Sequence, residues 1–561
     1  MHPSQPPTQS QWLNKNLLAL SRVQPVLCDR LHWPVEGDHL VMDEEQHWTL
    51  LYRGAKFPAV LSAAEIEKAC KGLDPTTTAT IFLFGVGLGE LLEAVLERAP
   101  KAHVIAWERD PWMLRQALAL RDWGSALKTD RLRFALNADL VPLIQNGMQG
   151  PRIFHPLLAR IYTNEFELLK SGCSEPRALI CCGTLFVDSL TQSLRAQGFS
   201  ILSFDVERIS HEEAEVVFNA WKPDLVAGIN GIDGLPEFCE ERGVHSICWE
   251  IDPALNGPCA LRIPTPHAHI FTYRQANVPA FEVAGYASVT YLPLAADPAK
   301  RKPQTLSASQ ADRYAAPVTF VGASLMENID RFQRDFIASL QEWQGTPEPQ
   351  ALDAMRRVIE MQRADFSRYN IPMYLDLLCP GFRAHNTSQG KTDPALYLAE
   401  ISAAEKRLNT MAALAPHAPE VWGDPGWRQI ETHGVRYRGA ALHETELPLI
   451  YSGSTINVDV GRLYQDDIVT MRIFDILACG GFVLAEHSSA LAELFEVGVE
   501  VASYRTLTEL KEKVAYFLTR PDEAKAIAER GRQAVLTRHT IDQRVRGMLE
   551  TVLKAGSAQA A

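Results

Sequence analysis

The chain has 561 residues, 46% hydrophobic and 22% charged, so it is long enough for about three or four domains with large buried cores. Its net charge of −13 argues against a partner gripped mainly through nucleic-acid phosphates. Ten cysteines in so long a chain do not form a disulfide framework, and their spacing matches no zinc site.

The N-terminal arm before Gln11 is rich in Pro, Gln and Ser and has no apolar signal region. No apolar run approaches the roughly 20 residues that a membrane-spanning helix needs. These features predict a soluble, cytoplasmic protein with no transmembrane segment.

The first chemical motif is a glycine-rich turn between a predicted strand, 80–84, and a predicted helix, 91–97. Gly85 and Gly87 lie in this turn, and Glu108 closes the next predicted strand. Glycines at such a turn let a cofactor approach the backbone, and an acid at the end of the next strand commonly binds a ribose. The alternative is a tight strand-to-helix turn in a domain without a cofactor.

The spacing of this turn resembles the S-adenosylmethionine site of class I methyltransferases. It is equally similar to the N-terminal portion of bacterial flagellin-modification proteins, where no methyl transfer is implied. No methyl-acceptor motif follows in the chain. S-adenosylmethionine therefore enters only as an alternative ligand.

A second alternation of strands and helices begins after residue 170 and predicts a parallel sheet covered on both faces. One of its strands, 245–249, runs into Glu250 and Asp252. The predicted strands of this series are 178–182, 200–204, 224–228 and 245–249, and the predicted helices are 186–197, 212–221 and 235–242.

A third sheet begins at residue 317, after a polar linker. Its first loop contains Gly322 and Ser324 and leads into a helix, and a helix N-terminus with free N–H groups can hold a phosphate. Residues 342–405 read as a helical insertion with a break at Cys379.

The most informative stretch is a strand (456–460), a polar loop, a short helix that begins at Met471 and stops at Gly480-Gly481, and a further strand (482–485). Arg472 and Asp475 are three residues apart in that helix. A cation at a helix start suits a diphosphate, and a carboxylate one turn later could bind ribose hydroxyls. The alternative is an ion pair between these two residues on a solvated face.

The run from Leu447 to Glu500, with Arg472-Ile-Phe-Asp475 followed by Ala-Cys-Gly, resembles the donor domain of GT-B glycosyltransferases. It is most similar to the bacterial group related to spore-coat-maturation proteins. The resemblance implies that Gly322 and Ser324 hold the β-phosphate of a nucleotide-sugar and that Asp475 touches its ribose. Eight positions before Asp475, Asp467 is the candidate first acid of the retaining enzymes.

The same resemblance extends to the second sheet through Trp249-x-x-Asp252-Pro. It implies that Glu250 or Asp252 is a general base or an anchor for the acceptor hydroxyl, unless Asp252 only caps a turn. Tyr451 and Ser452 are candidates for contacts to the base or ribose, with a core role as the alternative for Tyr451.

The predicted fold is therefore α/β, a GT-B architecture with an extra N-terminal Rossmann-like, methyltransferase-like domain. The predicted domains are 1–170, 171–312 and 313–540, with the insertion at 342–405 and a crossover helix and tail at 541–561.

The predicted activity is glycosyl transfer from a UDP, GDP, CDP or dTDP sugar, with no metal and no further cofactor. The resemblance points to a Ser or Thr of a surface protein such as flagellin, or to a surface polysaccharide, as acceptor. A methyltransferase and a non-catalytic binding protein of GT-B shape are the alternatives.

Overall fold

The computed structural model describes residues 11–32, 39–42, 47–52, 55–183, 185–252, 257–465 and 467–559. The predicted polar arm, Pro253 and Asp466 lie outside these ranges. The chain forms two compact units, Met1–Ile229 with Phe238–Ile247, and Asn230–Glu237 with Cys248–Ala561. Each unit is described by itself below. Parallel sheets with intervening helices confirm the predicted α/β class and its several Rossmann-like sheets.

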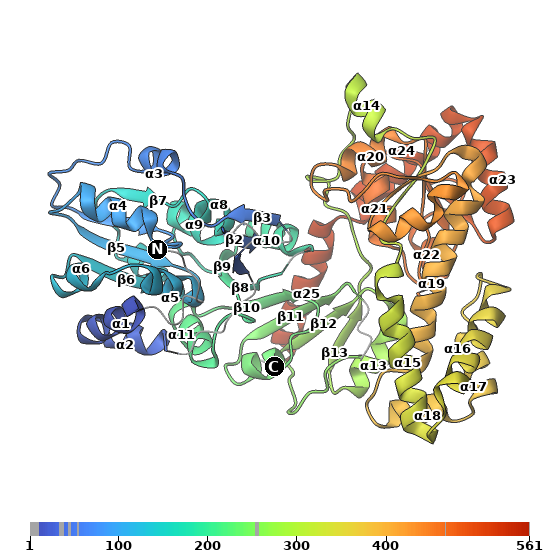
Figure 1. Ribbon diagram of the computed structural model, residues 1–561, viewed down its shortest axis with the longest axis horizontal. Helices are drawn as coiled ribbons and strands as arrows, with labels where there is room; N and C mark the ends of the chain where they lie inside the picture. Colours follow the sequence, from blue (N-terminus) through green and yellow to red (C-terminus); the bar gives the residue numbers. More distant parts are fainter. Residues whose placement is uncertain are drawn as a thin grey trace. The chain divides into compact units, whose positions relative to one another are not determined.

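The first unit begins with a four-stranded parallel sheet in the order β6-β5-β4-β7. Its central strand β4 (Thr80–Phe84) is almost wholly apolar and buried, as expected for a parallel sheet covered on both faces. The glycine-rich turn follows it and leads into α4 (Glu90–Arg98). The remaining strands are β5 (His103–Glu108), β6 (Leu132–Leu136) and β7 (Arg152–Phe154), and further helices include α1 (Gln11–Val23), α5 (Pro111–Leu120) and α6 (Gly124–Lys128) (Figure 1).

The first unit also contains a small antiparallel sheet and a second parallel set of strands. The antiparallel sheet consists of β1 (Leu40–Met42), β2 (Trp48–Tyr52) and β3 (Ala55–Pro58). In the parallel set, β8 (Arg177–Cys181) lies between β10 (Leu225–Ile229) and β9 (Ser200–Phe204). The neighbouring helices are α8 (Leu158–Ile161), α9 (Thr163–Ser171), α10 (Val187–Ala196) and α11 (His211–Trp221).

The boundary between the units falls within β11 (His245–Glu250). In the second unit, β12 (Ala268–Thr272) pairs in parallel with β13 (Ser288–Tyr291). A six-stranded sheet follows in the order β16-β15-β14-β17-β18-β19, and every pairing in it is parallel. Its strands are β14 (Val318–Val321), β15 (Glu420–Trp422), β16 (Arg436–Tyr437), β17 (Ile456–Val458), β18 (Val483–Glu486) and β19 (Ala502–Tyr504).

The predicted helical insertion is present as a group of helices with a core of its own. Figure 1 shows α16 (Glu348–Arg363), α17 (Ile371–Leu378) and α18 (Phe382–Ser388) in yellow beside two long helices, α15 (Ile329–Gln344) and α19 (Pro394–Ala413). The predicted break at Cys379 separates α17 from α18. Both long helices contribute apolar residues to the core of the insertion.

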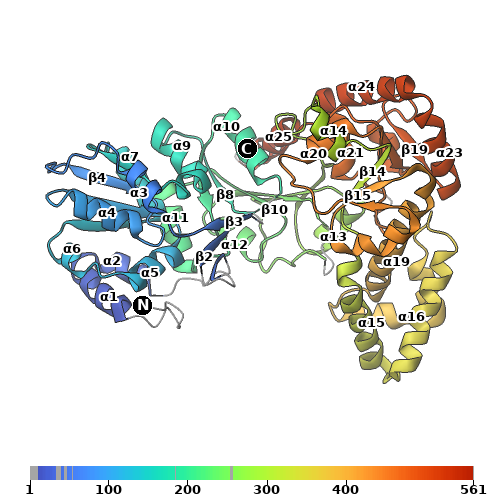
Figure 2. The ribbon, with the colours of Figure 1, turned by 45° about the horizontal axis from the view of Figure 1, so that its top comes forward.

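Helix α21 (Met471–Ala478) connects β17 to β18 of the C-terminal sheet and packs against α24 (Pro521–Arg538) (Figure 2). The last helix, α25 (Ile541–Gln559), is tied back to the segment that follows β13. Arg544 donates hydrogen bonds to the carbonyls of Pro293 (2.8 Å) and Leu294 (3.1 Å), and Ala296 bridges with Thr540. In the part of the chain that the structure describes, no helix has the length and apolar character to cross a bilayer.

Candidate functional site

The carboxyl edge of the C-terminal sheet places Arg472 against Gly322. Arg472 opens α21, its Nε donates to the carbonyl of Val321 (2.5 Å), and its guanidinium lies over the ring of Phe320 at 4.5 Å. A Cβ built on Gly322 would lie 2.6 Å from Nη2 of Arg472, so glycine is what admits the guanidinium to this turn. Arg472 also pairs with Asp459, which leaves the sheet at the end of β17 and is 2% exposed.

Two further arginines, Arg407 and Arg462, lie near the same edge. Arg407 of α19 is 6% exposed and donates to the carbonyl of Ala323 (2.7 Å). Among the described residues its Nε has no hydrogen-bond partner. Burial, and then the charges of Arg472 and Arg462, lower the pKa of Arg407 to about 9. A positive field this strong beside a glycine turn suits an anionic ligand, because an anion would offset the mutual repulsion.

The carboxylates near these arginines already have partners. Asp459 accepts from Thr470 Oγ1 (2.8 Å) as well as from Arg472. Arg462 pairs with Glu400 at 3.0 Å, and the same carboxylate accepts from the hydroxyl of Tyr464 (2.6 Å). The edge therefore holds three guanidinium groups against two buried carboxylates.

Ser324 lies in the predicted phosphate loop but is fully buried. Its N–H and its hydroxyl both donate to the carboxylate of Asp424 at 2.5 Å, and its oxygen accepts from the N–H of Met326 (3.2 Å). These contacts fix the shape of the turn after Gly322. The Ser324 hydroxyl and N–H are therefore both engaged by Asp424.

Asp475 points away from Arg472 and forms a buried pair with Arg301 from the polar linker that precedes the C-terminal sheet. The Arg301 Nε lies 2.8 Å from Oδ2 of Asp475, and its Nη2 lies 2.7 Å from Nδ1 of His443. Burial raises the pKa of the Asp475 carboxyl, although Arg301 opposes this. The alternative of an exposed pair between Arg472 and Asp475 is wrong, because each has its own partner and Asp475 is 4% exposed.

Tyr451 and Ser452 belong to a short helix, α20 (Leu447–Gly453), packed beneath this pair. Tyr451 is 3% exposed, and burial raises its pKa. The Ser452 hydroxyl donates to the carbonyl of Cys479 (3.0 Å) and accepts from the N–H of Gln304 (3.0 Å). Ser452 thus fastens the linker to the end of α21.

The three acids predicted for catalysis lie around the end of β12. Glu250 is 5% exposed and accepts from Thr272 Oγ1 (2.5 Å) and Asn277 Nδ2 (3.0 Å), and burial raises its pKa. Two residues after Thr272, Arg274 pairs with Asp467 at 2.6 Å. Glu250 and Asp467 are therefore linked through one short segment, Thr272 to Arg274.

Asp252 differs from these two acids because it is exposed. Its carboxylate accepts from Asn230 Nδ2 at 3.4 Å, and its N–H donates to Asn230 Oδ1 at 3.3 Å. The Asn230 side chain thus holds the turn after β11, which resembles the turn-capping alternative raised for this aspartate.

In the first unit, the glycine turn and Glu108 contact other groups of the protein itself. Glu108 is fully buried and accepts from the N–H groups of Val86 (2.9 Å) and Gly87 (3.1 Å) and from the hydroxyl of Tyr162 (2.6 Å). A Cβ on Gly87 would lie 2.6 Å from Nε2 of His155, and one on Gly85 would touch the same segment. Here the glycines admit His155, and the geometry favours the alternative of a cofactor-free turn.

Several residues that shape these sites were not predicted: Arg274, Arg301, Arg407, Arg462 and Asp459. Their partners are distant in the sequence, as with Arg301 and Asp475, so no short sequence motif predicts these pairs. Asp459 is the exception, since a carboxylate at the end of an apolar strand is a usable local signal.

No group of three or more His, Cys, Asp or Glu side chains able to hold a metal occurs among the residues that the structure places.

Comparison with known proteins gives one match to a family model. Residues 404–550 match the family described as glycosyl transferase-like. This range contains Arg407, Asp459, Asp467, Arg472 and Asp475. The match supports a glycosyltransferase function for the part of the chain that forms the arginine-rich edge. No curated protein matches the chain.

Three solved structures have low similarity to this chain. Sucrose-phosphate synthase from Thermosynechococcus elongatus is 12% identical with a TM-score of 0.42, over 69% of this chain and 100% of that one. A glycosyltransferase from Rickettsia africae is 10% identical with a TM-score of 0.39, over 68% and 98%. Anabaena HepE in complex with UDP and glucose is 13% identical with a TM-score of 0.36, over 70% and 95%. Similarities this low assign nothing to this chain.

Proposed function

We propose that this protein is a glycosyltransferase that moves a sugar from a nucleotide-sugar to an acceptor hydroxyl. The observation that carries the proposal is the convergence of Arg407 and Arg472 on the turn at Gly322, with Arg462 close enough to lower the pKa of Arg407. This edge lies at the carboxyl ends of parallel strands, where open α/β sheets bind ligands. Most of it falls within the residues that match the glycosyl transferase-like family.

The donor diphosphate would lie against these guanidinium groups. When the bond between the anomeric carbon and the phosphate oxygen breaks, negative charge grows on the departing diphosphate. Fixed cations stabilise that charge without reorganising, so they lower the barrier. Arg472 is the best placed of them, because Asp459 and the carbonyl of Val321 hold its guanidinium in one orientation.

Glu250 is our candidate for the base that takes the proton from the acceptor hydroxyl. Its pKa is raised by burial, which brings a carboxylate closer to the value at which general-base catalysis is efficient. Asp252 is the candidate for anchoring the acceptor, because its carboxylate is exposed. Asp467 stays the candidate first acid and Asp475 the candidate ribose contact, and each would have to release its arginine partner to reach a donor.

The acceptor follows only from the resemblance of the sequence to surface-modifying proteins. We propose a Ser or Thr hydroxyl of a surface protein such as flagellin, or a sugar hydroxyl of a surface polysaccharide. Both present an alcohol that needs deprotonation. Incubating the protein with a labelled nucleotide-sugar and either acceptor distinguishes them by which one carries the label.

The pairing of both Asp467 and Asp475 favours one second candidate, a protein that binds a nucleotide-sugar without transferring it. The two candidates differ in one measurement. A transferase releases free nucleoside diphosphate when donor and acceptor are present, whereas a binding protein shows ligand-dependent stabilisation and no release.

The test of the donor site is a thermal-unfolding screen with UDP, GDP, CDP, dTDP and S-adenosylmethionine. A ligand at about 100 times its dissociation constant stabilises the folded state by about 2.7 kcal/mol, which is readily detected. We expect one nucleoside diphosphate to stabilise the wild type and not Arg472→Gln. Gly322→Ala should also lose the shift, because the added methyl group displaces the Arg472 guanidinium.

The matched control is Arg383→Gln. Arg383 is likewise held in carboxylate pairs, to Asp393 (2.6 Å) and Asp376 (2.9 Å), but it lies in the helical insertion. The substitution should lower stability and leave the nucleotide shift intact. Stabilisation by S-adenosylmethionine alone, or a nucleotide shift that survives in Arg472→Gln, would contradict the proposal.

A further inference from the structure

The first unit contains a cavity of about 170 Å³ where the carboxyl ends of its two parallel sets of strands face each other. Arg109 reaches it from the end of β5, Cys182 and Gly183 follow β8, and Asp205 follows β9. All of its lining residues belong to the first unit, and none takes part in the proposed donor site. Ligands in α/β proteins bind beyond the carboxyl ends of parallel strands, and here two such edges converge.

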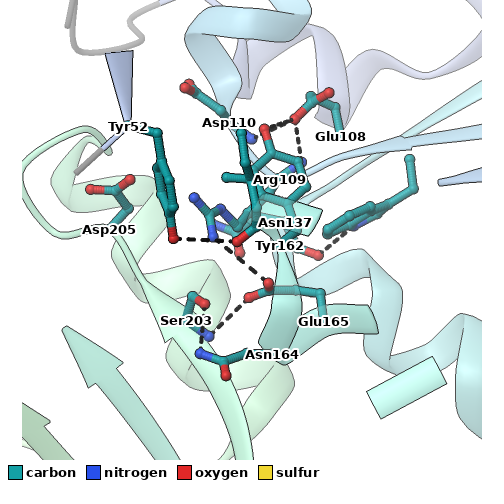
Figure 3. A network of polar contacts seen from close by, with 12 residues as sticks. Tyr52, Glu108, Arg109, Asp110, Asn137, Tyr162, Asn164, Glu165, Ser203 and Asp205 are labelled. Carbon is teal, nitrogen blue, oxygen red and sulfur yellow. Dashed lines mark hydrogen bonds and ion pairs between the residues drawn. The ribbon is translucent and has the colours of Figure 1, made fainter. Parts of the chain in front are cut away.

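Arg109 is the unusual group in this cavity. Its side chain is 7% exposed and lies 4.1 Å over the ring of Tyr162. Its closest charged partner, Glu165, is 3.7 Å away, which is an ion pair but too long for a hydrogen bond. Within the described part of the chain the Nε of Arg109 has no hydrogen-bond acceptor. Figure 3 shows the guanidinium in the space bounded by Tyr52, Glu165 and Asp205.

A buried guanidinium whose Nε–H has no acceptor calls for one, because nearly all buried polar groups in proteins are hydrogen-bonded. Glu165 does not supply it, because its nearer oxygen, Oε2, stays 3.7 Å from Nη1 of Arg109 and has no hydrogen-bond partner among the described residues. A phosphate is well suited, because its oxygens match the fork of an arginine.

The segment from β8 to Asp205 has the order of a mononucleotide-binding unit. A strand, a turn with Gly183, the helix α10, a second strand and then an acid follow one another. In such units the acid binds sugar hydroxyls and the turn approaches the phosphate. Asp188 lies in the first turn of α10, and its negative charge opposes the attraction of the helix dipole for an anion. Arg109 is therefore the main group that would attract an anion into this cavity.

Asp205 supplies the contacts that a sugar would need. Its side chain is 16% exposed, and it forms an ion pair with Arg208 at 3.5 Å. Burial raises the pKa of this carboxyl. A carboxyl group beside an open cavity can accept from, or donate to, neighbouring hydroxyls.

We propose that this cavity binds a phosphorylated sugar, with the phosphate on Arg109 and the sugar hydroxyls on Asp205. The cavity is smaller than the roughly 300–1,000 Å³ of pockets for drug-sized ligands, so it suits one sugar ring and one phosphate. The ligand is either a free sugar phosphate or the ribose phosphate of a nucleotide.

The experiment is isothermal titration of the full chain with inorganic phosphate, ribose 5-phosphate, UMP and AMP. Ribose 5-phosphate should bind more tightly than phosphate, and Arg109→Gln should weaken both by at least about tenfold, or about 1.4 kcal/mol. Asp205→Asn should weaken ribose 5-phosphate and leave phosphate unchanged. A gain for UMP or AMP over ribose 5-phosphate identifies the nucleotide source, and no gain identifies the free sugar phosphate.

Two control variants test whether the binding belongs to this cavity. Arg133→Gln removes an exposed arginine of the same unit, paired with Asp130, and should change nothing. Arg472→Gln should also leave ribose 5-phosphate binding intact, so failure of the donor-site proposal would not affect this result. Should Arg109→Gln fail to fold, Asp205→Asn carries the test. Absence of binding by all four probes, equal binding of phosphate and ribose 5-phosphate, or binding lost only in Arg472→Gln would overturn the proposal.

Discussion

Three histidines, His155, His443 and His539, have their pKa lowered to about 4, in each case mainly by burial. They are therefore neutral in the folded protein at pH 7. His443 and His539 also lie beside the arginines Arg301 and Arg544, whose charges act in the same direction. His539 packs against the rings of Phe474 and Phe495.

Acidification should destabilise the protein through these histidines, and His155 is the clearest case. Its pKa is lower in the folded state than the usual 6.5, so the unfolded chain binds the proton first. The stabilisation is complete above about pH 6.5 and is lost as the pH falls towards 4. We expect the free energy of unfolding to fall by about 2 kcal/mol per such histidine between pH 7 and pH 5.

Urea unfolding of wild type and His155→Gln at pH 7 and pH 5 measures this contribution. The variant loses packing beside Gly87 and is less stable at both pH values, but its pH dependence should be smaller. His211→Gln, which removes an exposed histidine, is the control. An unchanged pH dependence in His155→Gln would show that the pKa of His155 is not lowered in the folded state.

At the residue scale, the sequence predicted the local arrangement at Gly322 and Arg472 better than it predicted long-range partners. A glycine after one strand and an arginine at the start of a helix are each visible in a short window, and the sheet brings both to one edge. The partner of Asp475 is Arg301, and the partner of Asp467 is Arg274. Such pairs depend on how distant segments pack, which spacing along the chain does not encode.

At the scale of elements, two glycines in the last two helices should respond in opposite ways to the same change. A Cβ on Gly531 of α24 would lie 2.2 Å from the carbonyl oxygen of Glu500 and 2.6 Å from Leu477. For Gly547 of α25, the described atoms leave open space around the added methyl group.

We therefore expect Gly531→Ala to destabilise the protein by about 1–3 kcal/mol or more, because backbone must move to relieve the overlap. Gly547→Ala should stabilise it by about 0.5–1 kcal/mol, since alanine is the better helix former. Thermal unfolding of both variants tests the pair. Equal effects of the two substitutions would mean that α24 does not pack against the Glu500 segment as described.

Most elements could be predicted because buried parallel strands read as short apolar runs separated by helical patterns. Strand β4 has the predicted ends, and β8, α10 and α21 differ by a residue or less at each end. Strand β17 was predicted to reach Val460 but ends at Val458. Just beyond it, the Asp459 N–H still donates to the carbonyl of Leu484 (3.1 Å), while the Asp459 carboxylate pairs with Arg472.

At the scale of the whole molecule, helix α25 should be essential to the second unit. Ile541, Val545 and Met548 are each at most 2% exposed, and burial of such side chains contributes about 1.5–3 kcal/mol each. Arg544 adds the bonds to Pro293 and Leu294. We expect truncation after Arg538 to abolish cooperative unfolding of this unit, measured by calorimetry.

Truncation after Lys554 is the matched control, because it keeps every contact named for α25. It should leave the unfolding transition unchanged. If the chain truncated after Arg538 unfolded like the wild type, the return of α25 to the segment after β13 would contribute no stability.

The domain boundaries predicted at residues 170 and 312 remain predictions. The described contacts divide the chain differently, with the first unit extending to Ile229 and including Phe238–Ile247. Sequence patterns mark where a new strand series begins, but they do not report how strongly neighbouring series pack. The extensive contacts of α9 and Arg30 with the second strand series explain why it belongs with the N-terminal sheet here.

The course of the chain between the two units has a practical consequence for dissection of the protein. The chain passes from one unit to the other after Ile229, after Glu237 and after Ile247. A single proteolytic cut at any of these places does not separate the units cleanly. The units stay joined through another crossing, or a strand segment stays attached to the unit to which it does not belong. Expression of the second unit alone therefore requires a redesigned connection across residues 238–247, rather than a simple choice of starting residue.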